Sequence, residues 1–137
     1  MNSEHDIKYP RRSTIGSAGY DLFAPFDIYV EPGEWATVDT GVKFDGSEDV
    51  GFKNWVFMIF PRSGLSSKYG MRIINTVPII DQDYRGNIVV KITADKFFGI
   101  KKDERFLQGI FVPFGILSDE IPPTNIRTGG HGSTGRM

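Results

Sequence analysis

The chain has 137 residues, with 16 Lys and Arg residues against 17 Asp and Glu residues and a formal net charge of −1. These values are typical of one soluble globular domain, and they exclude a general cationic attraction for nucleic acid. The absence of Cys excludes disulfides, thiolate nucleophiles and cysteine zinc sites. Residues 1–12 lack the apolar run of a signal peptide, and no segment reaches the roughly 20 apolar residues of a membrane span. We therefore expect a cytoplasmic protein with no nucleic-acid or membrane partner.

Strand-forming residues dominate the sequence, which contains 15 Ile and 9 Val but only 4 Ala and 4 Leu, together with 16 Gly and 8 Pro. β-Branched residues favour strands, whereas Gly and Pro favour turns. Apolar runs bounded by turn residues predict strands, in chain order, over residues 20–24, 26–30, 35–44, 55–60, 71–74, 88–94 and 106–114. The sequence therefore predicts an all-β fold, either a distorted jelly roll or a β-sandwich.

Three segments add detail to this prediction. Residues 64–69 are expected to form one short helix, because Gly70 can adopt the left-handed conformation that ends a helix. Residues 55–60 are apolar on both faces of a strand, so each face must be covered by the second sheet or by another subunit. Residues 122–137 contain two Pro and several Gly but few apolar residues, which predicts a flexible C-terminal arm beyond a β domain of residues 1–121.

Residues 75–87 place charged and aromatic residues between apolar strands. A hairpin turn accounts for the Asp, Asn and Gly residues of this segment. It leaves unexplained why Tyr84 and Arg85 stand beside the two carboxylates of Asp81 and Asp83. Such a group suits a partly anionic ligand, and a carboxylate here can act as a general base toward water.

Two further segments are candidates for binding phosphate. Backbone N–H groups of Ser63 and Gly64 at the start of a helix can hold phosphate oxygens, with Arg62 adding charge. Taken alone, however, an ordinary Ser N-cap is the commoner explanation, because serine is a favoured cap whatever the function. Residues 127–135 intersperse Arg, His, Ser and Thr among glycines, which suits a lid that folds over phosphate, although flexible linkers look similar.

Two single residues are less specific. Asp21 is a lone carboxylate in an apolar run, which is costly unless it is paired, hydrogen-bonded, near a metal or facing solvent. Gln108 begins an apolar strand and can either donate to a ligand oxygen or face solvent.

Taken in order, these five segments resemble the five motifs of the trimeric dUTP pyrophosphatase (dUTPase) family. The resemblance extends over residues 16–135 and rests on residues 18–24, 61–65, 80–86, 105–108 and 129–135. It implies hydrolysis of dUTP to dUMP and pyrophosphate, which limits uracil in DNA and supplies dUMP for dTTP synthesis. It also implies a homotrimer with shared active sites, each closed by the C-terminal arm of one chain.

The resemblance assigns roles to individual residues. Asp81 is implied to be the general base that activates water for attack on the α-phosphorus. Tyr84 is implied to stack against the deoxyribose, and Asp21 to hold water molecules on a Mg²⁺ ion bound to the triphosphate. The implied substrate-binding residues are Arg62, Ser63, Gly64, Asn75, Tyr84, Gln108, Arg127, His131, Gly132, Ser133 and Thr134.

Two alternatives share this fold. A dCTP deaminase-like enzyme would attack the base and would use a Glu near the hairpin, whereas the sequence here is Asp81-Gln82-Asp83. A nucleotide-gated regulatory binding protein would retain the same site, with the polar loop of residues 45–54 as its natural partner surface.

Overall fold

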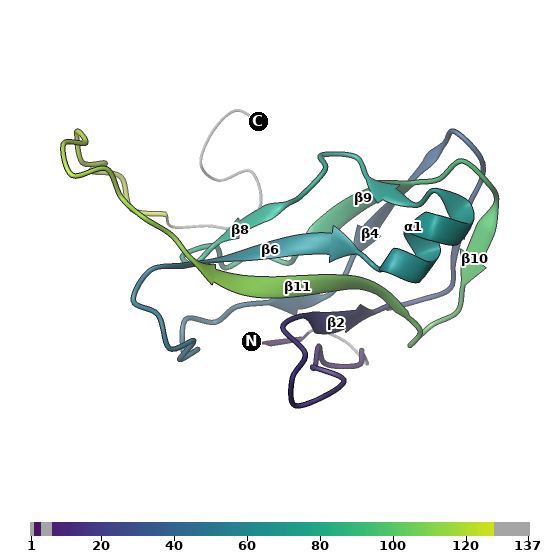
Figure 1. Ribbon diagram of the computed structural model, residues 1–137, viewed down its shortest axis with the longest axis horizontal. Coiled ribbons are helices and arrows are strands. Elements are labelled where there is room, and N and C mark those ends of the chain that lie inside the picture. Colours follow the sequence, from purple (N-terminus) through teal and green to yellow (C-terminus); the bar gives the residue numbers. More distant parts are fainter. Residues whose placement is uncertain (1, 4–6, 128–137) are drawn as a thin grey trace.

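The computed structural model describes residues 2–3 and 7–127, which form antiparallel sheets and one short helix (Figure 1). The helix α1 spans Ser63–Tyr69. The strands are β1 (Asn2–Ser3), β2 (Tyr20–Phe23), β3 (Ile28–Val30), β4 (Trp35–Asp39), β5 (Val42–Lys43), β6 (Trp55–Pro61), β7 (Arg72–Ile73), β8 (Ile79–Asp81), β9 (Val89–Thr93), β10 (Phe98–Ile100) and β11 (Arg105–Pro113). The predicted all-β class with one short helix is confirmed.

The strands form four antiparallel sheets in the described part of the chain. The largest has the order β2-β11-β6-β8, and a second has the order β4-β9-β7. Two-stranded ribbons join β10 to β3 and β1 to β5. Figure 1 shows the long strands β6 and β11 side by side, with α1 following the end of β6.

Some element boundaries differ from the sequence prediction. The single strand expected over residues 35–44 is divided into β4 and β5, because Gly41 adopts a left-handed φ of 74°. Next to it, the hydroxyl of Thr40 donates to the Ile88 carbonyl (2.8 Å) and accepts from the Val42 N–H (3.1 Å). The helix begins at Ser63, one residue earlier than expected, and ends at Gly70 with a left-handed φ of 68°, as predicted.

The core is mostly aliphatic and contains a cluster of aromatic side chains. Phe44 contacts Trp55 and Phe57 with ring centroids 5.3 and 5.4 Å apart, and Phe111 lies 4.7 Å from Phe57. Along β6, Trp55, Phe57 and Ile59 are buried. Edge-to-face and tilted contacts of this kind add to the stabilisation from burial.

Gly109 on β11 is required by this packing. A Cβ atom at residue 109 would lie 2.1 Å from Cζ of Phe57, so the ring or the strand would have to move. We expect Gly109→Ala to lower the free energy of unfolding by about 1–3 kcal/mol. Urea denaturation at a fixed protomer concentration measures this loss, and Gly115→Ala is the control, since nothing lies within 4 Å of a Cβ there. Equal stability of the two variants would contradict the packing described here.

The opposite face of the β2-β11-β6-β8 sheet is apolar and only half-buried. The cross-strand pairs Met58–Ile110 and Val56–Val112 lie on this face, and Ile79 of β8 extends it. The sequence analysis required both faces of residues 55–60 to be covered. The described residues bury the face of Trp55, Phe57 and Ile59 and leave the opposite face half-buried. No helix among the described residues has the length and apolar character to cross a membrane.

Candidate functional site

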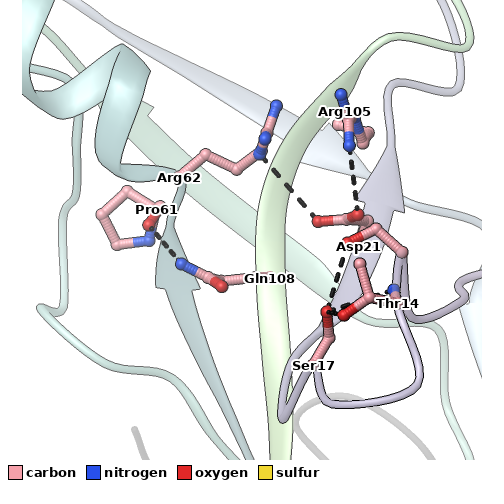
Figure 2. A network of polar contacts seen from close by, with 8 residues as sticks. Thr14, Ser17, Asp21, Pro61, Arg62, Arg105 and Gln108 are labelled. Atoms are coloured by element: carbon pink, nitrogen blue, oxygen red, sulfur yellow. Dashed lines mark hydrogen bonds and ion pairs between the residues drawn. The ribbon is translucent and has the colours of Figure 1, made fainter.

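Asp21 on β2 lies between two arginines in the first group of predicted site residues (Figure 2). Its carboxylate is 3.9 Å from Nε of Arg62 and 3.6 Å from a terminal nitrogen of Arg105, and its side chain is 13% exposed. The solvent-facing alternative for Asp21 is therefore wrong. The two cations offset the cost of removing this carboxylate from water.

A cavity of about 320 Å³ opens beside this carboxylate. Gln108 forms part of its wall, and its Nε2 donates to the Pro61 carbonyl over a long 3.4 Å (Figure 2). Gly19 packs close to it, since a Cβ there would lie 3.0 Å from Gln108 Oε1. The cavity is lined by Ser13, Ser17, Ala18, Gly19, Asp21, Arg62, Ser63, Gln108 and Ile110. The structure thus brings together four predicted residues from separate segments, which are Asp21, Arg62, Ser63 and Gln108.

Ser63 does not cap the helix. The N-cap residue is Arg62, with φ −71° and ψ 138° and no side-chain capping hydrogen bond, and Ser63 lies in the first turn. The alternative explanation of Ser63 as an ordinary N-cap is therefore wrong. Gly64 follows it in an exposed position with nothing within 4 Å of a Cβ, so its backbone can be approached closely.

Arg105 is a site residue to which the sequence assigned no role. Residues three apart on a regular strand point to opposite faces, which would separate Arg105 from Gln108. The pairing of β11 with β2 shifts between Arg105 and Leu107, so Phe106 and Leu107 are both buried while Arg105 reaches Asp21. The signal in the sequence for this shift is the adjacent apolar pair Phe106-Leu107, which interrupts the alternation of apolar and polar residues between Arg105 and Gln108.

A second group forms around Asp81 at the end of β8. Arg127 lies 2.9 Å from the Asp81 carboxylate and 3.4 Å from that of Asp83, and its guanidinium stands 5.5 Å from the ring centroid of Tyr84. The Arg127 side chain is 16% exposed, whereas that of Asp81 is 54% exposed. Nε of Arg127 is buried and has no hydrogen-bond partner within the described part of the chain. The carboxylate is therefore open to solvent on a side that the arginine does not cover.

The segment that carries Asp81 is held by strand pairing and by side-chain hydrogen bonds. Its residues 79–81 form a strand that pairs with β6, rather than only a turn. The hydroxyl of Tyr84 donates to the Asn87 carbonyl (2.8 Å), and burial raises the pKa of this phenol, so it stays neutral at physiological pH. Arg85 donates to the Gln82 carbonyl (2.8 Å), which makes it a brace of the turn.

The two groups lie on the same sheet face but do not meet within one chain. Gln108 is opposite Phe60, whereas Asp81 is opposite Val56, and these β6 residues are four apart. At about 3.3 Å per residue, the separation along the strand is about 13 Å. The half-buried apolar face described above occupies the space between the two groups.

The remaining predicted residues join neither group. Asn75 is exposed in the turn between β7 and β8, where its carbonyl accepts from the Val77 N–H (2.8 Å). His131, Gly132, Ser133 and Thr134 lie outside the described residues. Within residues 2–3 and 7–127, no three His, Cys, Asp or Glu side chains converge as direct metal ligands.

Comparison with known proteins identifies the family. The sequence model of the dUTPase family matches residues 5–135. A deoxyuridine 5'-triphosphate nucleotidohydrolase from Desulfitobacterium hafniense is 38% identical over 137 residues, covering 93% of this chain and 87% of that protein. The dUTPase from Streptococcus mutans has a similar structure, with a TM-score of 0.69 and 31% identity over 85% of this chain and 97% of that chain.

A bacteriophage enzyme is also similar. The dUTPase of Staphylococcus bacteriophage 80alpha, in a structure with dUPNHPP, matches with a TM-score of 0.71 and 25% identity, covering 97% of this chain and 95% of that chain. These structural matches confirm the predicted jelly-roll character of the all-β fold. The five segments, the fold and the matches over most of the chain agree, and the chain belongs to the dUTPase family.

Proposed function

We propose that this protein hydrolyses dUTP to dUMP and pyrophosphate. The observation that carries the proposal is a polar cavity of phosphate size, lined by Arg62, Ser63 and Gln108, and an accessible carboxylate beside a buried tyrosine, both on one sheet face. Family membership supports it, as do relatives named for dUTP hydrolysis and a related phage structure that contains a dUTP analogue. The substrate is a polyanion that does not cross a bilayer unaided, so the cytoplasmic location predicted from the sequence stays part of the proposal.

Asp81 is proposed as the general base. It takes a proton from a water molecule as the water oxygen bonds to the α-phosphorus, and the bond from that phosphorus to the β-phosphate oxygen breaks. Pyrophosphate leaves and dUMP remains. Tyr84 is proposed to pack against the deoxyribose, where a buried and hydrogen-bonded ring leaves no room for a 2′-hydroxyl. Asn75 is proposed to contribute to reading of the uracil edge.

The cavity beside Asp21 is proposed to hold the phosphates. Arg62 supplies positive charge, and the Ser63 hydroxyl, the Gly64 N–H and the Gln108 amide supply hydrogen-bond donors. Donors fixed before the reaction stabilise charge that develops on the leaving group. Arg127, His131, Gly132, Ser133 and Thr134 are proposed to close the site as part of the arm of residues 122–137.

Mg²⁺ is proposed as the metal that accompanies the triphosphate. Of the carboxylates that the structure describes, only Asp21 lines the phosphate cavity, and one is too few for a cage of direct protein ligands. It suits a contact through metal-bound water, since Mg²⁺ keeps several waters when it binds to phosphates. When bound, the ion would neutralise phosphate charge, while Asp21 would orient its waters.

A homotrimer with shared active sites completes the proposal. Because Asp81 and Gln108 are too far apart in one chain to reach the same α-phosphate, a complete site requires residues from two subunits. The half-buried apolar face between them provides the contact surface for a neighbour. The requirement that both faces of residues 55–60 be covered is met in this arrangement.

Product analysis tests the proposed function. The purified protein is incubated with Mg²⁺ and dUTP, dCTP or UTP in parallel, and the products are separated by chromatography. We expect dUMP and pyrophosphate from dUTP alone. Conversion of dCTP to dUTP would establish the deaminase alternative instead, which the comparisons do not favour; equal hydrolysis of UTP would remove the deoxyribose role of Tyr84.

A further inference from the structure

A second cavity, of about 520 Å³, lies beside Asp21 and is strongly cationic. It shares Ser13 and Asp21 with the phosphate cavity, so the two cavities adjoin. Its lining residues are Lys8, Arg11, Arg12, Ser13, Asp21, Phe23 and Arg105. Among residues 2–3 and 7–127, four cations and one carboxylate therefore line this cavity.

The single carboxylate is already engaged. Asp21 lies within 4 Å of both Arg62 and Arg105, so little of its charge is left for the other cations. Like charges gathered at one site repel one another unless an anion lies between them. The surplus of positive charge at this cavity therefore favours a bound anion.

The backbone fixes Arg11 at the cavity. The Arg11 N–H donates to the Asp21 carbonyl (3.3 Å) and the Asp21 N–H donates to the Arg11 carbonyl (2.8 Å), so the two residues form a directly opposed antiparallel pair. Side chains of such a pair lie on the same face. Among the described residues, Arg11 makes no ion pair with any carboxylate.

Lys8 and Arg12 complete the cationic lining in different ways. Nζ of Lys8 lies 4.5 Å from the ring centroid of Phe23, and this cation–π contact holds the ammonium at the cavity wall. Among the described residues, no carboxylate forms an ion pair with Lys8. Arg12 donates to the carbonyls of Ile15 (2.7 Å) and Ser17 (3.1 Å). Arg12 therefore fixes the turn over residues 13–17, and Lys8 and Arg11 are the cations free to bind a ligand.

We propose that Lys8 and Arg11 bind the pyrophosphate leaving group in this cavity. The identity of the anion rests on the proposed function, because cleavage in the adjoining cavity releases a pyrophosphate that carries several negative charges. The shared wall at Asp21 gives this product a short path into a region of matching charge. No bond is made or broken there, and the proposal assigns the cavity to pyrophosphate rather than to dUMP, which keeps only the α-phosphate.

Calorimetric titration with inorganic pyrophosphate tests the site directly. The wild-type protein is compared with Lys8→Gln/Arg11→Gln at constant ionic strength, because surface charge interactions are screened by salt. We expect the dissociation constant for pyrophosphate to rise about tenfold or more when two charge-assisted contacts are removed. Lys53→Gln/Lys96→Gln, which removes two exposed lysines outside both cavities, is the matched control and is expected to change it less than about twofold.

The outcomes separate this site from the catalytic proposal. Equal pyrophosphate affinity in wild type and Lys8→Gln/Arg11→Gln overturns the inference, as does a wild-type protein that binds inorganic phosphate as tightly as pyrophosphate or binds neither. Circular dichroism checks that the variant is folded, and unchanged inhibition by dUMP supports the assignment to the leaving group. If wild type fails to hydrolyse dUTP yet shows the expected loss of pyrophosphate binding in the variant, the proposed function falls and the anion site stands.

Discussion

Replacing Asp81 with Asn is expected to lower kcat for dUTP hydrolysis by about 10²–10⁴-fold, the usual contribution of a general base. Asn has nearly the same shape but cannot accept the proton of the attacking water. The affinity for dUTP is expected to change by less than about threefold, because the lost interaction acts in the transition state. Initial-rate kinetics gives kcat, and calorimetric titration with dUTP gives the dissociation constant of the slow variant.

Asp83→Asn is the matched control for this prediction. Asp83 is a second exposed carboxylate beside the same arginine, 3.4 Å from Arg127 compared with 2.9 Å for Asp81. Each variant removes one negative charge near Arg127, so a purely electrostatic effect on the arm would appear in both. We expect kcat of Asp83→Asn to stay within about tenfold of wild type. A greater loss of kcat in Asp83→Asn than in Asp81→Asn would show that Asp81 is not the general base.

The strands that could be predicted from the sequence are those with long apolar runs. β6 and β11 are rich in Ile, Val and Phe, and their positions agree with the prediction to within one residue. β8 was not predicted, because Ile79–Asp81 lies within a turn-rich segment and forms a strand only by pairing with the distant β6. Pairing of this kind is set by tertiary contacts, which local patterns do not contain.

The site was predictable as a set of residues but not as a geometry. The motif order identified Asp21, Arg62, Ser63 and Gln108, which the structure places around one cavity. The separation of this group from Asp81 depends on the register of β6 with both neighbouring strands, and a register cannot be read from one chain's periodicity. The surplus charge at Lys8 and Arg11 is likewise visible only once the backbone of residue 11 is seen beside β2.

The proposed sharing of active sites between subunits leads to a prediction that a site within one chain cannot reproduce. We expect Asp81→Asn and the double variant Ser63→Ala/Gln108→Ala each to be nearly inactive as homotrimers, since one lacks the base and the other two phosphate ligands. Coexpressed chains that mix at random should recover about a quarter of the wild-type activity. A site works when the subunit that gives the base carries Asp81 and its neighbour carries Ser63 and Gln108. In random trimers each condition is met with a probability of about one half, so about one quarter of all sites are intact.

Mixed trimers are isolated through different affinity tags on the two variants, which removes the inactive homotrimers. Turnover per isolated mixed trimer should therefore be about one third of wild type, because one of its three sites is intact. Coexpression of Asp81→Asn with an untagged copy of itself is the control and should stay inactive. If base and phosphate ligands acted within one chain, each chain would carry one defect and the mixture would be as inactive as its parents. Recovery is expected because Asp81 and Gln108 lie four residues apart along β6, or about 13 Å. One chain therefore cannot supply both groups to the same α-phosphate.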